Sequence, residues 1–431
     1  MTLRALPRSA ELLLLAAAAL FVGVNAISLS LVRTGALTWA HLQLPVVWLI
    51  LIGLAWGGLT MARPGHDPFL LPIYALLTGW GLVLQDRLAP DFVQRQLMWF
   101  VLGTLALLAV AVLPRSLRAL YRYRYTLLVT GLLLLAATLL FGVNPTGYGA
   151  TLWLPIPFTG GVFFQPSELL KLLMVFFFAS YFADRGDLLR SGQGRLGALP
   201  YLAPLLLMWG FGMTLLVWQQ DLGAATLFFL LFLALLYLAT GDRRYIWAGV
   251  FLLLAAGVIG YLVFDVVALR VEGWWNPWPE AADRAFQIVQ SLYALAAGGI
   301  IGQGVGQGYP TFVPVVHSDF VFAAIGEEWG LLGTLAVVVC FAVWAQRGFR
   351  AALRARRPFH MYLAAGMTVL LSTQTLLIMA GVTKLLPLTG VTLPLVSYGG
   401  SSMLLACVMM GLLIYLSAES PFAPGPSDDN A

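Results

Sequence analysis

The segment 221–240, DLGAATLFFLLFLALLYLAT, carries no charge after its first residue and is long enough to cross a lipid bilayer as a helix. A helix of about 20 apolar residues matches the thickness of the hydrocarbon core. Eleven other segments are also long and predominantly apolar. The twelve predicted spans lie near residues 11–32, 43–62, 68–85, 96–114, 125–142, 166–184, 197–218, 221–240, 245–265, 319–345, 359–381 and 401–418. We therefore expect an all-α polytopic membrane protein.

The composition agrees with this fold class. Of the 431 residues, 60% are hydrophobic and 10% are charged, and the mean hydropathy is +0.88. A soluble domain carries about 25% charged residues. Cys340 and Cys407 both fall inside apolar runs, and the four histidines show no ligand spacing. We interpret the cysteines as small core residues, without a disulfide or a cysteine–histidine metal site.

The first span has some features of a signal peptide, because basic residues precede it and Val24-Asn25-Ala26 resembles a cleavage site. Its apolar run continues to Val32, which is too long for a typical signal peptide. We interpret it as an uncleaved anchor.

The basic residues orient the bundle. With the N-terminus in the cytoplasm, the inner connections hold 17 of the 24 lysines and arginines, and the outer connections hold six. The remaining one, Lys171, lies within a span. This asymmetry follows the positive-inside rule and predicts that both termini are cytoplasmic. It also explains the net charge of +5 and the pI of 9.3, so no nucleic-acid partner is expected.

Three acidic residues lie where spans begin on the outer side, and this convergence suggests a functional site. They are Glu168, Asp221 and Asp319. Acids at membrane depth are costly to hold and usually face a cavity. Simpler explanations exist for the first two. Glu168 complements the start of a helix capped by Ser167 and pairs with Lys171 three residues later, and Asp221 begins a helix.

Asp319 is the strongest candidate for a catalytic group, because Ser318 already supplies a helix cap and a second cap would be redundant. Glu327 and Glu328 follow in the same span. Adjacent residues lie about 100° apart on a helix, so at most one of them shares the face of Asp319. We expect one of them to be a packing or hydrogen-bonding residue.

A large outer stretch, 266–318, precedes Asp319. It contains a cluster of three tryptophans suited to the headgroup region, an amphipathic piece at 284–292 and the glycine run 302–308. The glycine run superficially matches a phosphate loop, but no strand precedes it. We interpret it as flexible backbone that lets the stretch fold over the membrane surface.

The segment 385–402, LLPLTGVTLPLVSYGGSS, leads into the last span. Its prolines and paired glycines indicate a broken, re-entrant loop capped by Ser401 or Ser402. Its other interpretation is a set of backbone N–H and hydroxyl donors for an anionic headgroup. The candidate donors are Ser397, Gly399, Gly400 and Ser401.

The segment 385–402, with Gln165-Pro166-Ser167-Glu168 and His317-Ser318-Asp319-Phe320, closely resembles the SEDS family (shape, elongation, division and sporulation), which includes RodA, FtsW and SpoVE. The resemblance implies a ten-helix bundle in the bacterial cytoplasmic membrane. On that basis we divide the chain into an extra N-terminal helix pair at 1–66, a membrane core at 67–418 and a disordered cytoplasmic tail at 419–431.

The same resemblance implies peptidoglycan glycosyltransferase activity on lipid II, with a class B penicillin-binding protein as partner. It places the essential acid at Asp319, and it places an acid and a lysine at the mouth of a helix, at Glu168 and Lys171. The chain departs from the family pattern in three places. No arginine stands at 149–153, Ile378 replaces an asparagine, and Lys384 stands where a small residue or arginine is common.

The expected reaction is the attack of a sugar hydroxyl on an anomeric carbon, with loss of a prenyl pyrophosphate. Asp319 would be the base. The candidate cations for the pyrophosphate are Lys171, Lys384, Arg270 and Arg284, with a divalent cation as a candidate cofactor. The other candidate substrate-binding residues are Glu168, Asp221, Ser397, Gly399, Gly400 and Ser401. Two other functions stay open, namely a lipid II flippase or transporter and a non-catalytic scaffold for a penicillin-binding protein. The sequence leaves open whether the role is in elongation, division or sporulation.

Overall fold

A computed structural model describes residues 8–144, 150–157, 161–191 and 199–418. The described chain is almost entirely helical, with one two-stranded antiparallel sheet. The elements in chain order are α1 (Arg8–Thr34), α2 (Trp39–Ala62), α3 (Leu70–Leu88), η1 (Pro90–Phe92), α4 (Val93–Val112), α5 (Arg118–Arg122), α6 (Arg124–Phe141), β1 (Leu154–Pro155), β2 (Phe163–Phe164), α7 (Pro166–Ser191), α8 (Leu199–Trp218), α9 (Leu222–Thr240), α10 (Arg243–Val263), α11 (Asp265–Trp275), η2 (Trp278–Glu280), α12 (Phe286–Gly298), η3 (Pro310–Phe312), α13 (Val321–Arg354), α14 (Pro358–Val382) and α15 (Gly400–Ser417).

Each predicted span corresponds to a helix, and the prediction of an all-α polytopic membrane protein is confirmed. Among the described residues, 11 helices are long and apolar enough to cross a membrane. The twelfth predicted span corresponds to α3, whose 19 residues are almost all buried and whose last turn carries Gln85, Asp86 and Arg87. A helix surrounded by protein does not need the apolar outer surface that lipid demands, so its lower hydropathy fits its position.

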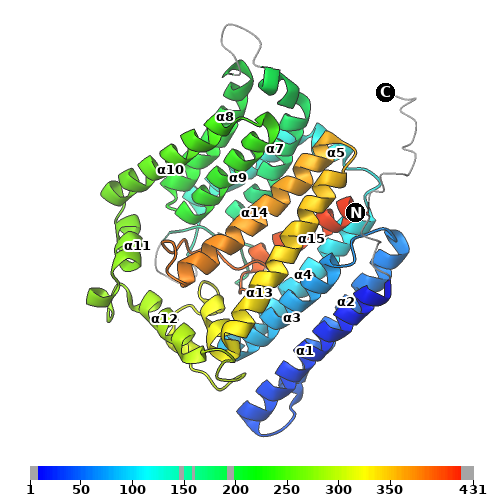
Figure 1. The fold of residues 1–431 in the computed structure, drawn as a ribbon, viewed down its shortest axis with the longest axis vertical. Helices are drawn as coiled ribbons and strands as arrows, with labels where there is room; N and C mark the ends of the chain where they lie inside the picture. Colours follow the sequence, from blue (N-terminus) through cyan, green and yellow to red (C-terminus); the bar gives the residue numbers. More distant parts are fainter. Residues whose placement is uncertain (1–7, 145–149, 158–160, 192–198, 419–431) are drawn as a thin grey trace.

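The centre of the bundle is formed by α7, α14 and α15, and α10 lies at its edge (Figure 1). In the apolar part of α7 89% of residues are buried, compared with 6% in α10. Small residues let the inner helices approach closely. A Cβ on Gly411 of α15 would lie 2.6 Å from the carbonyl oxygen of Leu107 on α4.

The predicted N-terminal helix pair lies along one edge of the bundle, where α1 packs on α3 and α2 packs on α1 and α4 (Figure 1). Two buried side-chain pairs attach it to the rest of the protein. Glu11 contacts His66 in the connection between α2 and α3, with Oε1 and Nε2 3.0 Å apart. His41 contacts Asp86 of α3 at the opposite end of the pair, with Nδ1 and Oδ2 2.6 Å apart.

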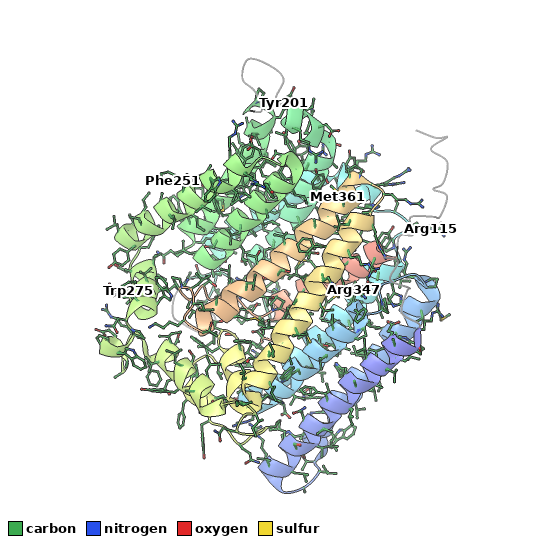
Figure 2. The ribbon with its side chains drawn as sticks, in the orientation of Figure 1. Arg115, Tyr201, Phe251, Trp275, Arg347 and Met361 are labelled. Atoms are coloured by element: carbon green, nitrogen blue, oxygen red, sulfur yellow. The ribbon has the colours of Figure 1, made fainter. Side chains whose placement is uncertain are left out.

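The outer stretch 266–318 is largely ordered into α11, η2, α12 and η3. Figure 2 shows Trp275 of α11 and the basic residue Arg115 on opposite sides of the bundle. The interpretation of the glycine run as flexible backbone is wrong. Its backbone is anchored to α13, since Gln303 N donates to Glu327 O at 2.9 Å and Gly304 N donates to Glu328 O at 3.0 Å. The predicted tail, 419–431, lies outside the described residues.

Candidate active site

Asp319 lies in the short connection between η3 and α13 and is half-buried. Ser318 Oγ donates to its Oδ1 at 2.8 Å, and its own N–H donates to Val315 O at 3.3 Å. The prediction that Ser318 caps the helix is wrong, because α13 begins at Val321 without a side-chain cap. The Ser318 hydroxyl therefore orients the carboxylate of Asp319 and does not complete a helix turn.

Arg270 of α11 brings a positive charge towards Asp319. Its Nη1 donates to Thr389 O at 3.2 Å, in the segment that follows α14 (Figure 1). The neighbouring residue, Gly390, has a φ of +70°, and a Cβ there would lie 3.3 Å from Arg270 Nη2 and 3.9 Å from Asp319 Oδ2. The guanidinium and the carboxylate thus face one point, which is open because residue 390 has no side chain.

Burial and charge act in opposite directions on this pair. Burial raises the pKa of Asp319, and the hydrogen bond from Ser318 and the charge of Arg270 partly oppose this rise. Burial lowers the pKa of Arg270, opposed by the charges of Asp319 and Asp221, and a guanidinium stays protonated in proteins. The site therefore holds a permanent cation beside a carboxyl group that is more basic than usual.

Asp221 is the second acid whose charge acts on Arg270. It caps α9 as predicted, with Oδ1 accepting a hydrogen bond from Ala224 N at 3.2 Å. Its Oδ2 is buried and has no hydrogen-bond partner among the described residues. Burial raises its pKa, whereas the Ala224 hydrogen bond, the charge of Lys171 and the hydroxyl of Ser167 lower it.

Glu168 and Lys171 form the predicted pair on α7, with Lys171 Nζ 2.7 Å from Glu168 Oε1. Lys171 is buried and also donates to Gln374 Oε1 of α14 at 3.1 Å. Gln374 Nε2 in turn donates to Thr392 O at 2.8 Å, and the hydroxyl of Thr392 contacts that of Ser402 at 2.8 Å. This polar chain connects α7, α14 and α15 to the 385–402 segment.

The remaining predicted caps are wrong for one reason, since each helix begins at a different residue from the one expected. Pro166 is the first residue of α7, and Ser167 Oγ accepts a hydrogen bond from Gln165 Nε2 at 3.1 Å. Gly399 is the N-cap of α15, with no side-chain cap. Ser401 Oγ accepts a hydrogen bond from Gln165 N at 3.0 Å.

The predicted donors at 397–401 serve internal contacts. Ser397 Oγ donates to Ser318 O at 2.5 Å and accepts from Leu393 N at 2.9 Å, so it fixes the residue before Asp319. A Cβ on Gly400 would lie 2.2 Å from Trp99 Nε1, which requires glycine there. Contact of Gly399, Gly400 or either serine with an anion remains a prediction.

Lys384 and Arg284 are not brought to Asp319 by any interaction of the described residues. Lys384 follows α14 with a φ of +60°, and its side chain is half-buried. Arg284 is exposed in the outer stretch. Glu327 and Glu328 of α13 are both hydrogen-bonding residues that hold the outer stretch. Glu327 Oε1 accepts from Tyr309 N at 2.6 Å, and Glu328 Oε2 accepts from Gly306 N of the glycine run at 3.1 Å.

Sequence reasoning missed Gln374 and Gly390. A lone amide in an apolar span was the available signal for Gln374, which lies one turn before Ile378 on α14. Among the described residues, no three histidine, cysteine, aspartate or glutamate side chains gather as a ready metal site.

The sequence of this chain is similar to those of known proteins. A family model for cell cycle proteins of the FtsW, RodA and SpoVE type matches residues 70–421. Peptidoglycan glycosyltransferase RodA of Mycobacterium tuberculosis is 37% identical, over 97% of this chain and 92% of its own. The probable peptidoglycan glycosyltransferase FtsW of Geobacter sulfurreducens is 35% identical, over 75% of this chain and 86% of its own.

A solved structure is also similar. It is described as showing structural coordination of polymerization and crosslinking by a peptidoglycan synthase complex, and one of its chains is 25% identical to this chain with a TM-score of 0.60. The match covers 87% of this chain and 96% of that one.

Proposed function

Because the chain belongs to the FtsW, RodA and SpoVE family of cell cycle proteins, we propose that Asp319 is the base with which it joins lipid II molecules. The protein is a peptidoglycan glycosyltransferase of the membrane, related to RodA over nearly its whole length. Its reaction polymerises lipid II into glycan strands.

In the proposed reaction, a hydroxyl of one lipid-linked sugar attacks the anomeric carbon of another. A new glycosidic C–O bond forms as the bond from that carbon to the pyrophosphate oxygen breaks, and the hydroxyl proton passes to Asp319. Burial suits Asp319 to this role, because a raised pKa makes its carboxylate a stronger proton acceptor. No second carboxylate contacts Asp319 among the described residues, which favours direct displacement with inversion.

The leaving pyrophosphate needs positive charge, and Arg270 is the cation best placed to supply it. Lys171 already donates to Glu168 and Gln374, so its charge is largely committed within the protein. Among the described residues, the hydrogen bond of Arg270 goes to a neutral carbonyl, that of Thr389, and its Nη2 faces the open point beside Gly390. The shared exposure of Arg270 and Asp319 to that point is the observation on which the proposal rests.

We also propose that a divalent cation binds near Asp319 and helps to neutralise the pyrophosphate. Magnesium in phosphate-transfer sites is commonly held by one or two carboxylates together with substrate phosphates. Asp319 would supply a carboxylate, and the substrate would supply the phosphate oxygens. If a divalent ion is needed, chelation with EDTA should abolish polymerisation and added Mg²⁺ should restore it.

The membrane orientation and the partner belong to the proposal too. The excess of basic residues in the inner connections supports cytoplasmic termini and a site on the outer face. The similarity to a chain of a peptidoglycan synthase complex supports a class B penicillin-binding protein as partner.

Replacement of Asp319 by asparagine tests the proposed base. The variant keeps the size of the side chain and removes the proton acceptor, so purified protein given labelled lipid II in detergent should polymerise about 10²–10⁴-fold more slowly than wild type. Wild-type polymerisation in detergent, where flipping has no meaning, separates an enzyme from a flippase. Full activity of Asp319→Asn would move the base elsewhere, first to Glu168 or Asp221. Full complementation in cells by an inactive variant would support a scaffold.

A further inference from the structure

The last turn of α3 holds the segment that carries Asp319 at two separate points. Gln85 Nε2 donates to His317 O at 3.0 Å, two residues before Asp319. Arg87 Nη2 donates to Gly308 O at 2.7 Å, near the start of the same segment. Gln85 is fully buried and Arg87 is half-buried. The last turn of α3 is therefore a buried anchoring point for residues 303–319.

Arg87 also connects this turn to α13. Its Nε lies 2.9 Å from Glu328 Oε1, and the side chain of Glu328 has no exposed surface. The other carboxylate oxygen of Glu328 accepts the hydrogen bond from Gly306 N. A buried charge pair depends on good geometry, because each ion has lost its water. A shift of Arg87 would therefore be transmitted to the glycine run and to α13 together.

The N-terminal helix pair holds the same turn of α3 from the opposite side. Arg33, at the end of α1, donates from Nη1 to Asp86 O at 2.9 Å and from Nη2 to Arg87 O at 2.6 Å. His41, near the start of α2, contacts the carboxylate of Asp86 at 2.6 Å. The last four carbonyls of a helix lack intrahelical partners, and a cation stabilises that end of the helix dipole. Arg33 meets both needs at the end of α3.

We propose that the N-terminal helix pair positions residues 303–319, the segment that carries Asp319, with Arg33 and His41 as positioning residues that act through Asp86 and Arg87. The family match begins at residue 70, so Arg33 and His41 lie outside the matched region. The inference rests on the proposed function, because it concerns the placement of Asp319 for that reaction. Misplacement of a reacting group by about 1 Å can lower a rate about 10²-fold.

The chain offers a matched control for simple loss of stability. Glu11 and His66 attach the same helix pair to the protein at its other end, through a buried contact of 3.0 Å. No described interaction connects that contact to residues 303–319. Glu11→Gln should therefore weaken the attachment of the pair without disturbing Asp319.

The experiment compares Arg33→Ala, His41→Ala and Glu11→Gln in the full chain purified with its partner. Polymerisation of labelled lipid II gives kcat and KM, thermal unfolding gives Tm, and hydrogen exchange reports the mobility of 303–319. We expect Arg33→Ala to lower kcat at least about tenfold with KM little changed, and to speed exchange in 303–319. Glu11→Gln should lower Tm with kcat within about twofold of wild type. Arg33→Lys should recover part of the rate, since it restores the charge at the end of α3.

A double variant tests the route. If Arg33 acts through Arg87, the pair Arg33→Ala/Arg87→Ala should be no slower than Arg87→Ala alone. The inference is overturned if Arg33→Ala keeps wild-type kcat, or if Glu11→Gln lowers kcat equally at the same loss of Tm. The proposed function fails separately, by full activity of Asp319→Asn. If Arg33→Ala does not fold, Arg33→Gln and His41→Asn decide by the same criteria.

Discussion

Replacement of Arg270 by methionine should move the pH dependence of polymerisation. Methionine keeps an unbranched aliphatic stem and removes the charge that faces Asp319. The charge of Arg270 lowers the pKa of Asp319 against the effect of burial, so its loss raises that pKa further. A base works as the carboxylate, and its activity falls as the pH drops through its pKa. The acidic limb of the rate profile should therefore shift to higher pH.

The structure sets the size of the effect. Arg270 Nη2 and Asp319 Oδ2 lie 3.3 and 3.9 Å from the Cβ position of residue 390. These distances place them at most about 7 Å apart, where two unit charges interact by about 2 kcal/mol at an effective dielectric constant of about 20. Because both residues are only half-buried, solvent screening reduces this figure. The rate on the alkaline plateau should fall as well, by about 10²–10³-fold, because the leaving group loses a donor.

The assay measures initial rates of glycan synthesis from labelled lipid II between pH 5 and 9. Two variants serve as controls. Arg270→Lys keeps the charge and should keep the acidic limb near its wild-type position. Arg284→Met removes an exposed outer charge and should leave both limb and plateau unchanged. A wild-type limb in Arg270→Met, or a shift to lower pH, would refute the reasoning that Asp319 is the base and faces Arg270.

Three further predictions concern the topology and the site. A cysteine placed in 266–318 should react with a membrane-impermeant reagent on intact cells and one beside Arg354 should not, and the reverse pattern would contradict the orientation. If Lys384 supplies the positive charge that the family pattern has before Gln-Pro-Ser-Glu, Lys384→Ala should slow polymerisation, and adding Thr151→Arg to that variant should partly restore the rate. A normal rate in the alanine variant excludes this role of Lys384. Gly390→Ala should slow polymerisation at least about tenfold with a stability loss of about 1–2 kcal/mol, because it adds a methyl group between cation and acid at a positive φ; an unchanged rate would show that substrate does not pass this point.

The sequence predicts the membrane helices well because each span is a local property. About 20 apolar residues must form a helix in lipid, whatever surrounds them. The Glu168–Lys171 pair is similarly local, since residues three apart on a helix are neighbours. The caps were predicted less well. A serine caps a helix only if the backbone enters the helix at that residue. At Ser318 and Ser167 the hydroxyl bonds to a side chain one or two residues away, and at Ser401 it bonds to the distant backbone of Gln165.

The site itself depends on partners that are distant in the chain. Arg270 meets the segment at 389–390 across 119 residues, and Arg87 meets Glu328 across 241. No periodicity connects such positions, so a single sequence shows these residues only as isolated charges near the ends of helices. Glu327 and Glu328 show the consequence. Because they follow Asp319 in one acidic segment, the sequence suggested that one of them shares its helix face. In the structure both contact the glycine run or the residue after it, and both hold the loop that carries Asp319. The charged residues near the ends of the helices thus divide into two that face the open point, Asp319 and Arg270, and several that hold the surrounding loop in place. Only their three-dimensional partners distinguish these two roles.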